Sequence, residues 1–192
     1  MKKYIFFFAI LFNLFIPLKS QTTKSTAQNN FDIKQSGFTS INQIGYEWEG
    51  YCKYFDFRTI NGYLITPHVS LGIGIGYENY YWDPGVLSIM PVFLDLRCYF
   101  PIKKSAPFFY FDGGYGSILS YTSPNWLYLS PSGGTCFGGG IGLKTFISNS
   151  VFIIMDLGIS FQKIDYTYLH HYGNIPENWT LGAFVFRIGL GF

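Results

Sequence analysis

The chain has 192 residues, of which 21% are aromatic and 12% are charged, and its formal net charge is +2. Intrinsic disorder requires many charges and few aromatic residues, so this composition excludes it. The small net charge argues against a nucleic-acid-binding surface, and three widely spaced cysteines provide neither a disulfide framework nor a zinc site.

Residues 1–20 have the pattern of a secretory signal peptide. A short basic start precedes an apolar run that ends at Leu18 and is short for a transmembrane helix. Small residues allow cleavage after Ser20 or, farther along, after Ala27. Residues 21–35 are polar and are predicted to form a flexible leader.

Beyond the leader, residues 36–192 contain eight apolar and aromatic runs that are separated by turn-forming clusters. Within a run the side chains alternate with the period of two that is typical of β-strands. The connections alternate between short turns and longer segments, the longest being 120–132 and 164–178, as in outer-membrane barrels. The runs are 36–48, 55–66, 68–81, 86–100, 107–119, 133–147, 150–163 and 179–192.

One face of each run is bulky and apolar, whereas the other is small or charged. In 69–78, for example, Leu71 and Ile73 alternate with Gly72 and Gly74. Glycine weakens a solvated strand but fits the inside of a narrow barrel, so we expect the apolar face to contact lipid. The sequence therefore predicts an all-β, closed, eight-stranded, antiparallel up-and-down transmembrane barrel with both termini on the side of the short turns. A soluble lipocalin-like barrel is the alternative.

The run 55–66 fits this scheme least well. If Asp56 and Arg58 point inward, regular alternation places Asn61 on the lipid side. We therefore predict a β-bulge near Thr59 and Ile60, which would return Asn61 to the lumen.

Several segments resemble the small outer-membrane β-barrel proteins of the OmpA/OmpX-like superfamily, in the form common in Bacteroidetes. They are Thr59-Ile60-Asn61-Gly62-Tyr63, Ser70 to Gly74, Pro91 to Arg97 with Tyr99-Phe100, Pro107-Phe108-Phe109, and Arg187 to Phe192. The resemblance covers 36–192 and implies export to the outer membrane, with no cofactor and no shared catalytic motif. It also implies contacts with outer-membrane lipid and lipopolysaccharide, periplasmic chaperones and the barrel-assembly machinery. That machinery would recognise an assembly signal formed by Ile188, Leu190 and Phe192.

Ten charged residues fall on the face that is predicted to line the lumen. The interior of an eight-stranded barrel is only wide enough for side chains, so we expect these charges to pair as a structural network without a water channel. An ion path or a catalytic carboxylate pair is the alternative. The ten are Glu47, Asp56, Arg58, Glu78, Asp95, Arg97, Asp112, Lys144, Asp156 and Arg187.

No catalytic or metal-binding residue is predicted. His68-Val69-Ser70 resembles the His-x-Ser element of lipid A deacylases, but it follows a short turn and so lies far from the outer leaflet. His170 and His171 are adjacent, so their side chains diverge and are a poor metal pair. Cys52 and Cys136 could form a disulfide only if the fold brought their Cα atoms within about 7 Å of each other. Free thiols are expected instead.

We therefore predict a non-enzymatic outer-membrane protein with a structural, envelope-integrity or surface-interaction role. Its loops 120–132 and 164–178 would bind partners through aromatic side chains. One alternative is a lipid-modifying enzyme at the outer leaflet, for which Ser120, Ser123, His170 and His171 are the available residues; another is a narrow small-solute channel. The loop aromatics are Trp126, Tyr128, Tyr166, Tyr168, Tyr172 and Trp179.

Overall fold

The computed structural model describes residues 36–49, 52–82, 85–122, 129–170 and 173–192, all within one compact unit, Phe31–Phe192. The predicted signal peptide and leader lie outside the described residues. Within the described ranges, no helix is long and apolar enough to cross a membrane.

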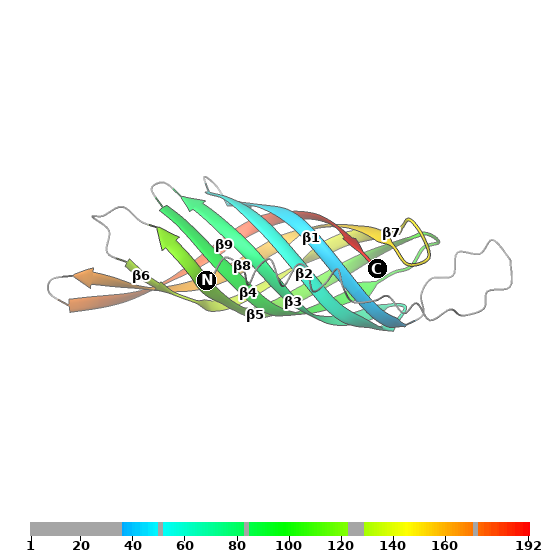
Figure 1. Ribbon diagram of the computed structural model, residues 1–192, viewed down its shortest axis with the longest axis horizontal. Coiled ribbons are helices and arrows are strands. Elements are labelled where there is room, and N and C mark those ends of the chain that lie inside the picture. Colours follow the sequence, from blue (N-terminus) through cyan, green and yellow to red (C-terminus); the bar gives the residue numbers. More distant parts are fainter. Residues whose placement is uncertain (1–35, 50–51, 83–84, 123–128, 171–172) are drawn as a thin grey trace, which may run out of the picture. The chain divides into compact units, whose positions relative to one another are not determined.

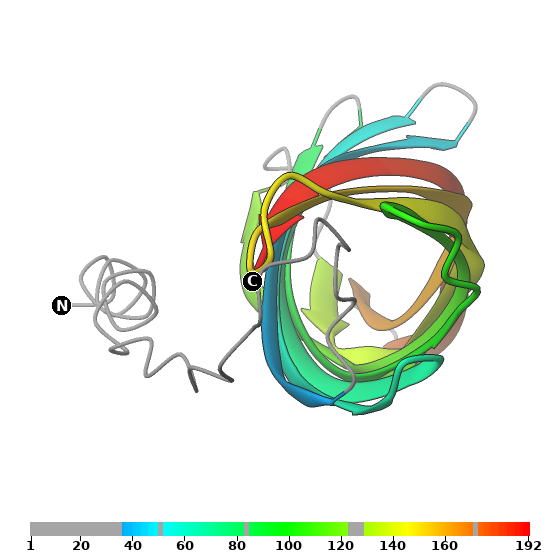
Figure 2. The ribbon, with the colours of Figure 1, turned by 90° about the vertical axis from the view of Figure 1, so that its right-hand side faces the viewer.

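The described residues form one closed antiparallel barrel (Figures 1 and 2). Strands that follow one another along the chain pair, except that β5 pairs with β7 and β6 pairs with β8, and the last strand pairs with the first. β6 and β7 pair with successive parts of β8 and together fill one of eight positions, so the predicted eight-stranded architecture is confirmed. The strands are β1 (Gly37–Glu49), β2 (Cys52–Thr66), β3 (Val69–Trp82), β4 (Gly85–Tyr99), β5 (Ser105–Thr122), β6 (Leu129–Ser132), β7 (Gly134–Phe146), β8 (Phe152–His170) and β9 (Gly173–Gly191).

The seam between β1 and β9 closes the barrel. Their register runs from Trp48 opposite Phe184 to Ile41 opposite Gly191. One residue further, the amide of Phe192 donates to the carbonyl of Ser40 at 3.0 Å, and the amide of Ser40 donates back at 2.9 Å. The C-terminal residue therefore belongs to the seam. It lies at the end of the barrel that carries the short turns, which we call the turn end.

Side chains alternate between the interior and the exterior as predicted. Large apolar residues cover the exterior, with Phe184 72% exposed and Ile73 62% exposed. Glycines and charged residues occupy the interior, where a Cβ at Gly74 would overlap the ring of Phe93. Contact between this apolar exterior and water would be unfavourable, because the free energy of hydration rises with the apolar area that stays exposed.

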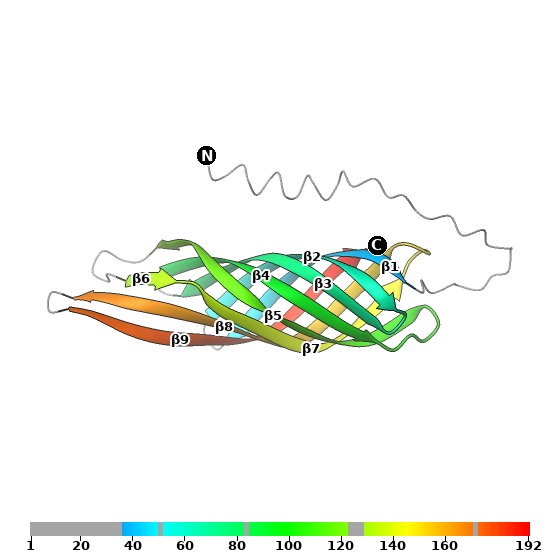
Figure 3. The ribbon, with the colours of Figure 1, turned by 90° about the horizontal axis from the view of Figure 1, so that it is seen from below.

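The end opposite the turn end, which we call the hairpin end, differs from the prediction. Residues 164–178 do not form a long loop, because β8 and β9 stay paired from Ile164 opposite Trp179 to His170 opposite Gly173 (Figure 3). β6 adds a third strand along this extension. The alternating aromatic and β-branched residues of this segment suit a strand despite its polar composition. The other predicted loop, 120–132, is also partly strand, since β5 and β6 extend into it.

The predicted bulge near Thr59 and Ile60 is wrong, and the irregularity in the β2–β3 register lies farther along, between Leu64 and Thr66. The β2–β3 register is unbroken from Lys53 opposite Tyr81 to Leu64 opposite Ser70. Regular alternation keeps Ile60 and Leu64 buried in the interior, and a bulge before them would turn both outward. Asn61 therefore stays on the exterior.

Candidate functional site

All ten charged residues that were predicted to line the lumen are buried inside the barrel. Seven of them form one cluster, which we call the ionic layer. It consists of two arginines and five carboxylates drawn from six strands: Glu47, Asp56, Arg58, Glu78, Asp112, Asp156 and Arg187.

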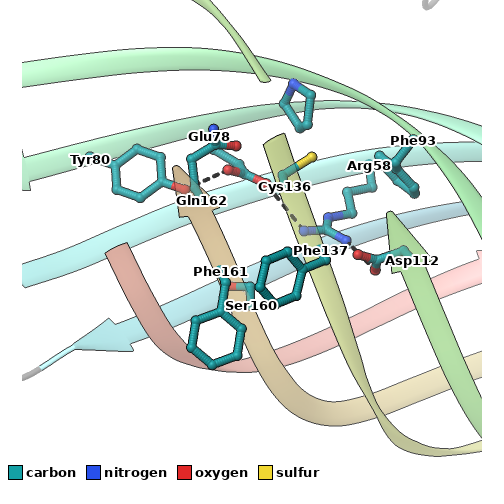
Figure 4. A pocket seen from close by; sticks show the side chains of 11 residues that line it. Arg58, Glu78, Tyr80, Phe93, Asp112, Cys136, Phe137, Ser160, Phe161 and Gln162 are labelled. Atoms are coloured by element: carbon teal, nitrogen blue, oxygen red, sulfur yellow. Dashed lines mark hydrogen bonds and ion pairs between the residues drawn. The ribbon is translucent and has the colours of Figure 1, made fainter. Parts of the chain in front are cut away.

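Arg58 links carboxylates from neighbouring strands and from across the lumen. Its Nη1 donates to Asp112 Oδ2 at 2.9 Å, and its Nη2 donates to Glu78 Oε1 at 3.2 Å. Its Nε donates to Asp56 Oδ1 at 3.2 Å. Figure 4 shows the guanidinium reaching between Glu78 and Asp112. One planar group thus joins three strands.

Arg187 makes the corresponding contacts on the other side of Asp56. Its Nε donates to Asp56 Oδ2, its Nη2 lies 3.3 Å from Glu47 Oε1, and its Nη1 lies 3.4 Å from Asp156 Oδ1. Asp56 is therefore shared by both arginines. Gly45 leaves room for this contact, since a Cβ there would lie 2.7 Å from the Arg187 Cγ atom.

The remaining three charged residues lie beside the ionic layer. Arg97 pairs with Asp95 at 2.9 Å and reaches the layer through Gln43, which accepts from Arg97 at 3.1 Å and donates to Asp156. Lys144 lies over aromatic rings, with its Nζ 3.9 Å from the centroid of Phe152. A cation over a ring face is attracted by the ring quadrupole.

Uncharged polar partners complete the network, and sequence reasoning did not identify them. The Ser160 hydroxyl donates to Glu47 at 2.8 Å, the Tyr80 hydroxyl donates to Glu78 at 2.6 Å, and Arg187 donates to the Tyr110 hydroxyl at 3.1 Å. The alternation of the sequence already places these three residues on the inward face of their strands. Which residues meet across the lumen depends on the stagger of the strands, which alternation alone does not specify.

Apolar side chains fill the barrel on both sides of the ionic layer. Along β8 the inward residues include Ile154, then Asp156, then Ile164. The cluster toward the turn end contains Ile41, Leu64, Phe108 and Ile154 among others, and the cluster toward the hairpin end comprises Tyr80, Leu87, Ile89, Ile164, Tyr166 and Ala183. Beside Arg58 and Glu78 a cavity of about 10 Å³ remains, which is room for about one water molecule.

The residues considered for catalysis or metal binding do not assemble into a site within the described part of the chain. His68 is exposed in the turn after β2, and Ser70 is buried with its hydroxyl 3.4 Å from that of Tyr99. Ser120 is exposed near the end of β5, and His170 ends β8. Ser123 and His171 lie outside the described residues, within which no cluster of three metal-ligating side chains occurs.

The cysteines and loop aromatics have separate positions. Cys98 and Cys136 are free thiols, so Cys136 is not bonded to Cys52. Tyr166 is buried in the hairpin-end cluster, which corrects its predicted place on an exposed loop, whereas Trp179 is exposed. Trp126, Tyr128 and Tyr172 lie outside the described residues, and Tyr168 lies in β8 opposite Leu129 of β6.

No family model and no curated protein matches the sequence. The fold is similar to those of solved outer-membrane barrels. These include AlkL (TM-score 0.58, 12% identity, 91% of this chain and 96% of that chain), outer membrane protein W of E. coli (0.57, 12%, 84% and 99%) and OprG of Pseudomonas aeruginosa (0.56, 10%, 82% and 95%). The likeness confirms the predicted small outer-membrane barrel fold. The assignment to a Bacteroidetes type stays a prediction.

Proposed function

We propose that the protein is an integral outer-membrane barrel that is exported through its N-terminal segment and has a non-enzymatic role in envelope integrity or surface contact. The observation that supports this proposal most is the filled interior of the barrel. Because an ionic layer lies between two apolar clusters, the barrel is a packed scaffold, and its apolar exterior suits the hydrocarbon of a membrane.

The hairpin-end extension of β8 and β9 is the surface that this scaffold would present outside the cell. Trp179 is 47% exposed, its ring lies edge-on to Tyr166 at 5.4 Å, and its Nε1 donates to Glu177 at 3.2 Å. An aromatic side chain that is held by a paired strand loses little entropy on binding, which favours recognition. Lipopolysaccharide and surface ligands are the partners proposed for this extension. The barrel-assembly machinery and periplasmic chaperones are those proposed for Ile188, Leu190 and Phe192.

The purified protein should form no stable channel in planar bilayers. Ions would have to cross both apolar clusters and the paired charges between them, because the cavity beside Arg58 accommodates about one water molecule. Single-channel recording at increasing voltage measures this, with a large porin as the positive control. Reproducible unitary steps would contradict the closed interior and favour the narrow-channel alternative.

Cells that lack the gene should keep an unchanged lipid A profile and become more permeable to a hydrophobic dye. A lipid-modifying enzyme would instead change the profile, and would require a nucleophile and a base at the hairpin end. The matched variant is His170→Ala with His171→Ala in the full chain, which should restore the dye barrier. The lipid A profile is measured by mass spectrometry, and the permeability is measured by uptake of the dye. A profile that changes in the deletion strain and in the histidine variant would establish the enzymatic alternative.

A further inference from the structure

The tight turn between β4 and β5 carries two lysines at the turn end of the barrel. Ile102 and Ser105 exchange backbone hydrogen bonds, with the Ile102 amide donating at 2.6 Å and the Ser105 amide donating at 3.0 Å. Lys103 and Lys104 form the tip between them, and both side chains are exposed. We call residues 102–105 the lysine turn.

Lys103 has a backbone conformation that favours glycine. Its φ is 54°, and among the described residues it is the one residue other than glycine with a positive φ. Tight hairpin turns normally place glycine or asparagine in this left-handed region, where a Cβ is disfavoured. The turn therefore gives up backbone stability to hold an ammonium group at its tip, and such an outlier indicates a functional position.

The apolar exterior of the barrel continues up to the lysine turn. Phe100 and Ile102 extend the outward face of β4 and are 52% and 63% exposed. Phe109 of β5 is also exposed, and its ring lies edge-on to that of Phe100 at 5.9 Å. Because Ile102 directly precedes Lys103, the ammonium groups lie where the hydrocarbon ends and the lipid head groups begin once the barrel is inserted.

Lys103 has no carboxylate partner within the part of the chain that the structure describes. Lys163 at the hairpin end, by contrast, lies 3.6 Å from Asp165. The solvent-accessible carboxylate side chains among the described residues, Asp165 and Glu177, both belong to the hairpin end. The charge of Lys103 is therefore available to an anion from outside the chain.

The combination of cations and apolar side chains favours a lipid with a negative head group. A lysine ammonium binds phosphate as a point charge, and an anionic lipid surface attracts each lysine that lies near it. The exposed Phe100 and Ile102 would contact the acyl chains of the same lipid, whereas a soluble anion would gain nothing from them.

We propose that the lysine turn binds the head group of an anionic phospholipid in the leaflet at the turn end. Lipopolysaccharide is the lipid proposed for the opposite leaflet, at the hairpin end. The site rests on the proposed membrane insertion, and it would fix the depth of the barrel in the bilayer from the periplasmic side.

The test titrates the refolded full chain, in nonionic detergent micelles, with phosphatidylglycerol or with phosphatidylcholine of the same acyl chains. Native mass spectrometry counts the bound lipids. The parent should bind phosphatidylglycerol at least about tenfold more tightly, or about 1.4 kcal/mol. A variant that combines Lys103→Asn with Lys104→Gln should lose this preference, and asparagine accepts the positive φ of the turn. Lys104→Gln alone, which leaves Lys103 in place, should lower the preference about threefold. The matched control is Lys163→Gln, which should keep it.

Two further measurements separate the sources of failure. Glycerol phosphate, the head group without acyl chains, should not compete at the lipid concentrations used, and binding as tight as that of the lipid would establish a soluble-anion site instead. Insertion into phosphatidylcholine vesicles is followed by heat-modifiable gel migration. A parent that inserts but shows no lipid preference overturns the site and leaves the membrane assignment intact. A preference that both turn variants retain, or that Lys163→Gln weakens equally, overturns the role of the turn. A chain that does not insert contradicts the proposed function and the lipid site together.

Discussion

Replacing Arg187 by leucine is expected to destabilise the barrel by about 3–5 kcal/mol, the range for breaking a buried ion network by removing one partner. Leucine fills part of the volume, but it leaves Asp156 without an arginine and leaves Glu47 and Asp56 with Arg58 alone. Arg58 already serves four carboxylates and cannot take over these contacts without losing others.

The measurement is urea-induced unfolding of the refolded chain in detergent micelles, followed by intrinsic tryptophan fluorescence. Arg187→Lys keeps the charge but not the forked geometry, so its midpoint should fall between those of the parent and the leucine variant. The control removes a solvated ion pair: Lys163 and Asp165 lie 3.6 Å apart, each about 44% exposed, so Lys163→Ala should cost less than about 1 kcal/mol. A leucine variant no less stable than this control would show that the ionic layer is not required for stability.

Alternation predicted which residues enter the lumen, because a period of two fixes the face of every residue in an unbroken strand. Asp95 and Arg97, two residues apart on β4, point inward for this reason and pair with each other. The sequence could not predict that Gln43 would connect Arg97 to Asp156 across the lumen. That contact depends on the stagger of the strands around the closed barrel, which is a property of all eight positions at once.

Two sequence arguments failed because each judged a segment by its own composition. Asn61 was assigned to the lumen since it is polar, but the strand follows Ile60 and Leu64, whose burial in the interior depends on regular pairing with β3. Residues 164–178 were assigned to a loop since they form a long connection between two apolar runs. Pairing between β8 and β9, with β6 alongside, supplies the backbone hydrogen bonds that let this segment continue as strand beyond the rest of the barrel.

The glycines of the interior should tolerate a methyl group far less well than those of the exterior, and two neighbours on β5 allow a matched test. A Cβ at inward Gly114 would overlap the carbonyl oxygen of Val92 and lie 2.6 Å from the Cα of Phe93, which are backbone atoms of the adjacent strand. At outward Gly113 the nearest atom is 3.9 Å away, in ordinary contact. Gly114→Ala should therefore lower the free energy of unfolding by about 1–3 kcal/mol through overpacking. Gly113→Ala should leave it unchanged or raise it by about 0.4–1 kcal/mol, because alanine restricts the unfolded chain. Urea midpoints of the two variants in the same micelles decide the matter, and equal shifts would contradict the tight packing of β4 against β5.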